Sequence, residues 1–297
     1  MGPQGNPQGS WKLLATSVRE RAEAAVAKRL RSIKGESIFR GNPPGYTRSP
    51  EDNLVPGVTR EDFWDDLTDG DGNELSDSPR APAKFCAAYS SSALVVNTFG
   101  PFRRSPDHLT LAGYTDFRKS QFERKCPTGL RGRKPNLDFL AAGSKNLVAV
   151  ESKFLETLRP TKEAEFKESY NQVIQTKAEP VWQDTYKALL VDPKKFIHLD
   201  DAQLVKHYLG IRNTFQDCRV TKVLVYLFWE PTNADDLPEF REHRREVELF
   251  SRAVEGSEIR FVALSYSQLW QNWSTESGWD DMLAHIEVLA LRYELSI

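Results

Sequence analysis

The sequence has little of several features that mark large classes of protein. Its three cysteines, Cys86, Cys126 and Cys218, lie too far apart for the paired spacing of a zinc site or a disulfide framework. No apolar run approaches the ~20 residues that span a bilayer, so we expect no membrane segment. Residues 1–10 have neither a charged region nor an apolar core, so we expect no signal peptide. A reducing cytoplasm is therefore the expected compartment.

Two further absences narrow the function. The sequence has no Gly-x-x-x-x-Gly-Lys-Ser/Thr loop, which excludes a P-loop nucleotide motor. Its formal net charge is −2, so it lacks the basic excess of a general DNA-coating protein, and any contact with nucleic acid must come from a local patch. The chain has 297 residues, of which 39% are hydrophobic and 28% charged, as is typical of a globular protein with a sizeable core.

The most informative feature is a set of charges within apolar segments. Asp138 lies in an expected strand at residues 136–142, and Glu151 and Lys153 lie in another at residues 147–154. Side chains alternate along a strand, so Glu151 and Lys153 share a face and Ser152 takes the other. Charges in so apolar a run are costly to bury unless something compensates them. A divalent cation would do so, together with a second carboxylate.

The turn between these strands supplies that carboxylate. A turn centred between residues 144 and 145 places Asp138 opposite Glu151 and Asn136 opposite Lys153. Opposed residues lie about 5 Å apart, and two carboxylates at that distance suit Mg²⁺, which prefers oxygen ligands. A slip of one residue would move one acid to the other face, so the prediction depends on this register. The alternative is a surface hairpin with three ordinary charges on a solvated face.

These residues resemble the PD-(D/E)XK nuclease superfamily, and more narrowly a bacterial branch of it. The segments that carry the resemblance are residues 122–130, 135–138 and 150–153, within a similar region of roughly residues 85–230. The resemblance departs from the usual pattern because Pro135 is not adjacent to the acid. The first core helix also lacks the acid that many members carry.

The resemblance implies both the chemistry and the fold. Asp138, Glu151 and the backbone carbonyl of Ser152 would bind Mg²⁺ or Mn²⁺, and Lys153 would be the catalytic lysine. The substrate would be nucleic acid, with DNA favoured. The fold would be α/β and restriction-endonuclease-like, an αβββαβ core whose mixed central sheet is flanked by helices, with N- and C-terminal elaborations.

The order of expected elements agrees with such a fold. We divide the chain into an N-terminal extension, residues 1–80, and a nuclease-like domain, residues 81–297. The extension holds a basic helix, a Pro/Gly-rich loop and an acidic loop, and the domain has its core at about 85–230 and a C-terminal elaboration at about 231–297. We expect helices at 11–34, 87–99, 161–190 with a break at Pro180, 201–209, 238–254 and 280–295, and further strands at 121–125, 220–229 and 259–265.

Two other segments carry candidate site residues. Glu123 either joins the acids from the preceding strand or forms a surface ion pair with its basic neighbours. Gln203, Lys206 and His207 share one helix face. In nucleases of this resemblance the helix before the last core strand often directs a Gln at the metal, so Gln203 is an accessory candidate, although an exposed polar face explains the same residues. His207 is not expected to serve a nucleophile, because no catalytic Ser or Cys motif accompanies it.

A basic cluster precedes Asp138 and is the candidate phosphate-contacting patch, although a charge run is often only a solvated face. Its members are Arg118, Lys119, Arg124, Lys125, Arg131, Arg133 and Lys134. The large aromatic residues are assigned to the core rather than to base stacking.

The sequence therefore predicts a metal-dependent nuclease. One alternative is a catalytically inactive nuclease fold that binds nucleic acid or protein, against which the intact Asp138, Glu151 and Lys153 argue. Another is an interaction protein that uses the charged helix at residues 238–254.

Overall fold

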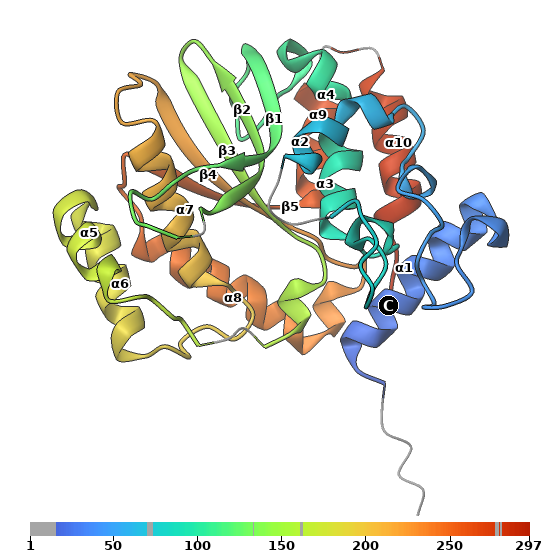
Figure 1. Ribbon diagram of the computed structural model, residues 1–297, viewed down its shortest axis with the longest axis horizontal. Coiled ribbons are helices and arrows are strands. Elements are labelled where there is room, and N and C mark those ends of the chain that lie inside the picture. The colour runs from blue at the N-terminus through green and yellow to red at the C-terminus, as the bar shows by residue number, and fades with distance from the viewer. Residues whose placement is uncertain (1–15, 70–73, 133, 161–162, 277–278, 280) are drawn as a thin grey trace, which may run out of the picture.

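The computed structural model describes residues 16–69, 74–132, 134–160, 163–276, 279 and 281–297. Within these ranges one sheet has the strand order β1-β2-β3-β4-β5 (Figure 1). Strands β1, β2 and β3 form an antiparallel meander, whereas β3, β4 and β5 run parallel. The predicted α/β fold with a mixed central sheet is confirmed. The strands are β1 (Phe117–Lys125), β2 (Asn136–Gly143), β3 (Asn146–Lys153), β4 (Thr221–Phe228) and β5 (Ile259–Ser265).

Helices cover both faces of the sheet, as Figure 1 shows. Because side chains alternate along β3, Val148 and Val150 enter one hydrophobic cluster, and Leu147 and Ala149 enter the other. The first cluster packs against α1 (Val18–Lys34), α2 (Trp64–Thr68), α3 (Ser91–Phe99), α4 (Pro101–Arg104), α9 (Tyr266–Glu276) and α10 (Met282–Tyr293). The second packs against α5 (Ser169–Lys177), α6 (Pro180–Val191), α7 (Asp201–Thr214) and α8 (Pro238–Ala253).

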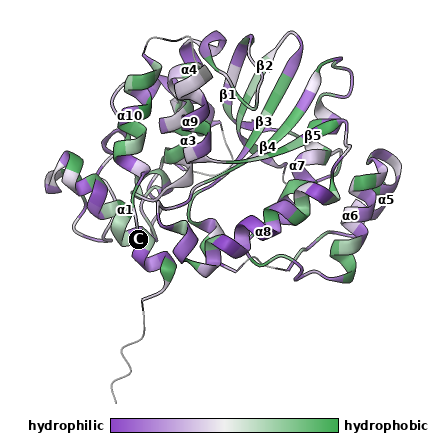
Figure 2. Ribbon diagram, turned by 180° about the vertical axis from the view of Figure 1, so that it is seen from behind, coloured by the Kyte–Doolittle hydropathy of each residue, from purple (hydrophilic) through white to green (hydrophobic). Residues whose placement is uncertain are grey.

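The central strands are apolar because they are buried on both faces. Figure 2 shows them largely hydrophobic, whereas α8 alternates between hydrophilic and hydrophobic residues. The apolar residues Phe240, Val247 and Phe250 of α8 are buried, at spacings that bring them to one side of the helix. No helix in the described part of the chain is long and apolar enough to cross a membrane.

The predicted hairpin register is confirmed. Strands β2 and β3 pair from Phe139 with Val150 to Ala142 with Leu147. This is the register of a turn centred between residues 144 and 145. The next pair in the same register is Asp138 with Glu151. The αβββαβ order is also present, as α3, β1 to β3, α7 and β4. Helices α5 and α6 are inserted between β3 and α7.

Several predicted boundaries differ for local reasons. The helix expected from residue 87 begins at Ser91, because the Ser90 side chain accepts a hydrogen bond from the Ala93 backbone N–H at 3.2 Å and caps it. The predicted break at Pro180 separates α5 from α6, but residues 163–168 of the expected helix at 161–190 are not helical. Helix α9 was not predicted.

Helix α7 runs through Gly210, which was expected to end it, and continues to Thr214. A Cβ atom at Gly210 would lie 2.5 Å from the backbone oxygen of Cys126. The glycine therefore permits the helix to approach the chain after β1 and does not act as a stop signal.

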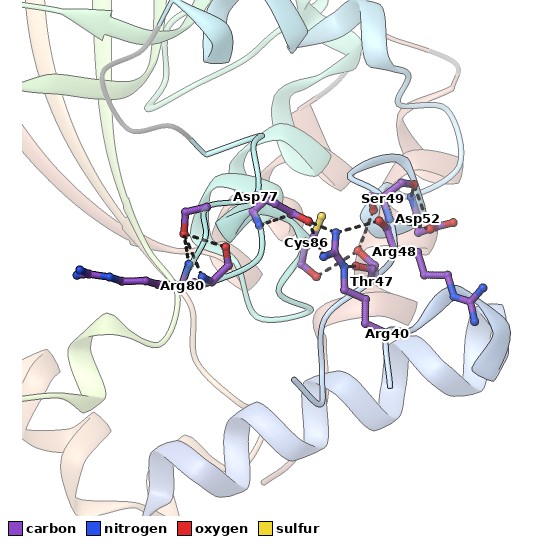
Figure 3. Close-up of polar contacts among 11 residues, drawn as sticks. Arg40, Thr47, Arg48, Ser49, Asp52, Asp77, Arg80 and Cys86 are labelled. Atoms are coloured by element: carbon purple, nitrogen blue, oxygen red, sulfur yellow. Dashed lines mark hydrogen bonds and ion pairs between the residues drawn. The ribbon is translucent and has the colours of Figure 1, made fainter. Parts of the chain in front are cut away.

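The N-terminal region is held against the rest of the chain. Ala22, Val26 and Leu30 of α1 belong to the same hydrophobic cluster as Phe139 of β2. The following segment is tied by polar contacts (Figure 3): Arg40 donates hydrogen bonds to Asp77 at 2.7 Å and to the Thr47 carbonyl at 2.9 Å, and the Thr47 hydroxyl donates to the Cys86 carbonyl at 3.1 Å. The start of the expected first helix and part of the acidic loop, residues 11–15 and 70–73, lie outside the described residues. The proposed boundary at residue 80 stays a prediction.

Candidate metal centre and cleft

Three carboxylates occupy matching positions on three adjacent strands. Asp138 lies across from Glu151 in the register of β2 and β3. On its other side, β1 pairs Phe122 with Phe139 and Arg124 with Leu137, which places Glu123 across from Asp138. Glu123 and Asp138 line the same cleft. The structure therefore brings Glu123 to the predicted site.

The backbone at Glu123 is unusual for a strand. Its φ is 48°, in the left-handed region that non-glycine residues adopt at a cost of about 1–2 kcal/mol. Its side chain accepts a hydrogen bond from the Asn136 amide at 3.1 Å. Strain of this kind is concentrated at functional sites, where the surrounding structure holds it in place.

Two side chains of α7 meet two side chains of β3. The Lys153 ammonium lies 2.6 Å from Oε1 of Glu151 and donates a hydrogen bond to Oε1 of Gln203 at 2.7 Å. Nε2 of His207 lies 2.7 Å from Oε2 of Glu151. The four side chains form one chain of contacts in the order Gln203, Lys153, Glu151, His207. Gln203 is thus brought to Lys153, and its accessory role at a metal stays a prediction.

These groups are largely removed from water. The side chain of Glu151 is 2% exposed and that of Lys153 is 13% exposed. Burial acts to raise the pKa of Glu151, but Lys153 and His207 outweigh it and lower this pKa to about 2. Burial acts to lower the pKa of Lys153, but Glu151, Glu156 and Asp138 raise it above its ordinary value. Both groups are therefore ionised at neutral pH.

Asp138 and Glu123 show the opposite behaviour. Burial raises the pKa of Asp138 well above its ordinary value, and the charges of Glu151 and Glu123 raise it further. The pKa of Glu123 is also raised, chiefly by burial. The hydrogen bond from Asn136 lowers this pKa, whereas the charges of Glu74 and Glu151 raise it further. A cation would relieve this repulsion between carboxylates.

The donor set suits a hydrated hard cation. Oε2 of Glu151 is buried, and Nε2 of His207 is its neighbour at 2.7 Å. Oδ2 of Asp138 accepts the Ser152 backbone N–H at 2.6 Å, which fixes this carboxylate against β3. Among the residues that the structure describes, no three His, Cys, Asp or Glu side chains could hold one ion together. Mg²⁺ commonly takes one or two carboxylates and completes its shell with water and phosphate oxygens, so the two acids fit it.

Glu123 and Asp138 line a cleft of about 920 Å³. One wall comes from the segment between β1 and β2, and includes Arg131 and Lys134. The other comes from the segment before α5, which includes Phe166 and Lys167, and Lys206 of α7 also lines the cleft. The contributions of Lys167 and Lys206 were missed in the sequence, because these residues lie 29 or more positions after Asp138.

The predicted basic patch is divided by the structure. Of its members, Arg131 and Lys134 line the cleft. Lys119 pairs with Ala142 near the hairpin turn, four residues or about 13 Å along β1 from Glu123, and Arg118 adjoins it. Arg124 donates to the Gln121 side chain at 3.4 Å, and Lys125 donates to the Asp69 carbonyl at 2.8 Å. Arg133 lies outside the described residues.

His207 is the functional candidate that sequence reasoning set aside. It was weighed only as the partner of a nucleophile, whereas the structure places it on Glu151. The signal that could have found it is its spacing of four residues from Gln203, since both then point from one helix face toward β3.

Comparison with known families agrees with this fold. A family described as Restriction Endonuclease associating with ARP matches residues 19–294. The chain belongs to this restriction-endonuclease family. No curated protein matches the chain, and no solved structure does.

The match runs from α1 to α10, so it includes both the acids and the helices around them. The predicted resemblance to restriction-endonuclease-like nucleases is confirmed. Membership supports nuclease activity in general and an interaction with nucleic acid.

Proposed function

We propose that this chain hydrolyses phosphodiester bonds in DNA with the help of Mg²⁺ or Mn²⁺. The observation that carries the proposal is the row of Glu123, Asp138 and Glu151 across three strands, with Lys153 beside Glu151. Two of these acids, Glu123 and Asp138, line the cleft. Buried carboxyl groups whose pKa is raised by neighbouring carboxylates, as those of Asp138 and Glu123 are, are typical of a place where a cation binds.

Each residue has a role in this proposal. Asp138 and Glu151 would hold the ion, together with the Ser152 carbonyl, while Glu123 and Gln203 would orient the surrounding groups. The bound ion would polarise a phosphate oxygen and activate water. Lys153 keeps its proton, because the charges around it raise its pKa. Its ammonium would offset negative charge on the phosphate and position the attacking water.

The walls of the cleft supply the phosphate contacts. Arg131, Lys134, Lys167 and Lys206 place four positive side chains on its lining. Most affinity for nucleic acid comes from such charges, which release counterions from the phosphates. Replacing Arg131 and Lys134 together by Ala should weaken DNA binding at low salt. It should also reduce the slope of log K against log[salt] by about 0.9 for each phosphate that the variant no longer neutralises.

The direct test is cleavage of single-stranded DNA, double-stranded DNA and RNA, each with Mg²⁺, Mn²⁺ or EDTA. We expect cleavage of DNA that requires the ion. Asp138→Ala and Lys153→Ala should each lower the rate by about 10²–10³-fold or more, because they remove a ligand and a charge that stabilises the transition state. Asp184→Ala is a matched control, since its side chain is 76% exposed on α6 and touches none of the acids.

The outcome also separates the two main hypotheses. A wild-type protein that binds nucleic acid with strong salt dependence but cuts none of the substrates is a binding module on a nuclease fold. Cleavage that persists in EDTA would contradict the role given to the ion.

A further inference from the structure

We propose that His207 is a positioning residue of the metal site, and that it holds the Glu151 carboxylate in the orientation that binds the ion. This inference rests on the proposed metal site and extends it to a residue on another element. Its basis is the 2.7 Å contact between Nε2 of His207 and Oε2 of Glu151, two atoms that are both buried.

The spacing along the two elements explains the contact. Gln203 and His207 are four residues apart on α7, a rise of about 6 Å. Lys153 and Glu151 are two residues apart on β3, a distance of about 6.6 Å. The spacing of the two residues on α7 is close to the spacing of the two residues on β3. Gln203 therefore meets Lys153, and His207 meets Glu151. Helix α7 thus fixes both charged groups of β3 at once.

Loss of His207 would leave Oε2 of Glu151 without a protein partner. Apart from His207, no described side chain reaches that oxygen, since Lys153 contacts Oε1. The carboxylate would then be free to turn both oxygens toward the Lys153 ammonium, which lies 2.6 Å away. A carboxylate has about four lone-pair positions. With His207 in place, one direction on each oxygen is used by the protein and another stays available to the ion.

His207 is not assigned as a ligand itself. Within the described ranges no group of three His, Cys, Asp or Glu side chains is arranged to share an ion. Its imidazole is fully buried, and its Nε2 faces Oε2 of Glu151 at 2.7 Å. Its effect would come through Glu151, as a partner outside the direct ligands that restricts how a ligand points.

The test is the affinity for Mn²⁺, measured by calorimetry at one fixed pH in the absence of nucleic acid. We expect His207→Ala to weaken Mn²⁺ binding by about 10–100-fold, the usual effect of removing a partner of a metal ligand. His207→Gln keeps an N–H donor at a similar reach and should recover most of the affinity. Recovery by Gln would not be expected if the ring served only to fill space.

His285 supplies a matched control. It is a buried histidine on α10, on the opposite side of the sheet, with its Nε2 3.1 Å from the Thr98 carbonyl. His285→Ala should lower the thermal stability and leave Mn²⁺ affinity within about twofold of wild type. Thermal unfolding in EDTA measures the stability cost of each variant separately from metal binding.

The possible results distinguish the two proposals. If wild type binds Mn²⁺ but cuts no nucleic acid, the proposed function fails and the comparison of His207 variants still decides the role of His207. If wild type cuts DNA and His207→Ala binds Mn²⁺ as tightly as wild type, the role of His207 is refuted while the function stands. A wild-type protein that binds no Mn²⁺ overturns both.

Discussion

Replacing Lys153, which forms a buried ion pair with Glu151, should lower the free energy of unfolding by more than is usual for a charged residue. Lys153→Met removes the ammonium but keeps a side chain of similar length, and leaves Glu151 ionised in a buried position. The nitrogen–oxygen distance is 2.6 Å and the side chains are 13% and 2% exposed. At an effective dielectric constant of about 20, the attraction at this distance is about 6 kcal/mol before desolvation is subtracted.

The net effect follows from what remains after the change. Breaking a buried pair by removing one partner typically costs about 3–5 kcal/mol, because an uncompensated charge stays behind. His207 still contacts Glu151, so we expect a value near the lower end, about 3 kcal/mol. Removing both charges in Lys153→Met with Glu151→Gln should bring the free energy of unfolding back to within about 1–2 kcal/mol of wild type.

The assay is urea unfolding at pH 7 in EDTA, so that metal binding does not contribute. The m-value should stay constant while the midpoint falls for the single variant and recovers for the double variant. Lys187→Met is the control, because the Lys187–Asp184 pair is 64% and 76% exposed and should contribute about 0–1 kcal/mol. A loss below about 1 kcal/mol for Lys153→Met, or a double variant less stable than the single one, would refute the reasoning.

Three further changes test the site and its supports. Asp138→Asn should stabilise the metal-free protein at pH 7, because burial and the charges of Glu151 and Glu123 raise the Asp138 pKa and make its ionised form unfavourable; thermal unfolding in EDTA measures this, and a destabilised variant would contradict it. The Glu151 pKa is lowered from 4.5 to about 2, so its ionised form stabilises the fold above about pH 4.5 and that contribution is lost as the pH falls toward 2. Urea unfolding between pH 2.5 and 6 should show this slope in wild type, and Glu151→Gln should reduce it. Gly210→Ala should destabilise the protein by about 1–3 kcal/mol, since the new Cβ would lie 2.5 Å from the Cys126 carbonyl oxygen; an unchanged unfolding midpoint would show that α7 moves freely away.

The sequence by itself determined the parts of the site that depend on local order. Alternation along β3 placed Glu151 and Lys153 on one face, and the length of the turn fixed Asp138 across from Glu151. Both inferences use the two-residue period of a strand, which any neighbouring structure must respect. The order of strands and helices likewise predicted a mixed sheet flanked by helices, because a chain with this pattern has few ways to bury its apolar faces. The αβββαβ arrangement of the core was implied by the resemblance to nucleases.

Only the tertiary structure decided which distant residues complete the site. The left-handed backbone at Glu123, the contact of His207 with Glu151 and the place of Lys167 and Lys206 in the cleft depend on how β1, α7 and the segment before α5 pack around the sheet. The same packing divided the basic cluster, because Arg131 and Lys134 line the cleft whereas Lys125 donates a hydrogen bond to the Asp69 carbonyl. Such placements are set by contacts between segments far apart in the chain. These contacts leave no periodic pattern in the local sequence from which they could be predicted. They are also the contacts that remove Glu151 from water and give its charge a large effect on stability.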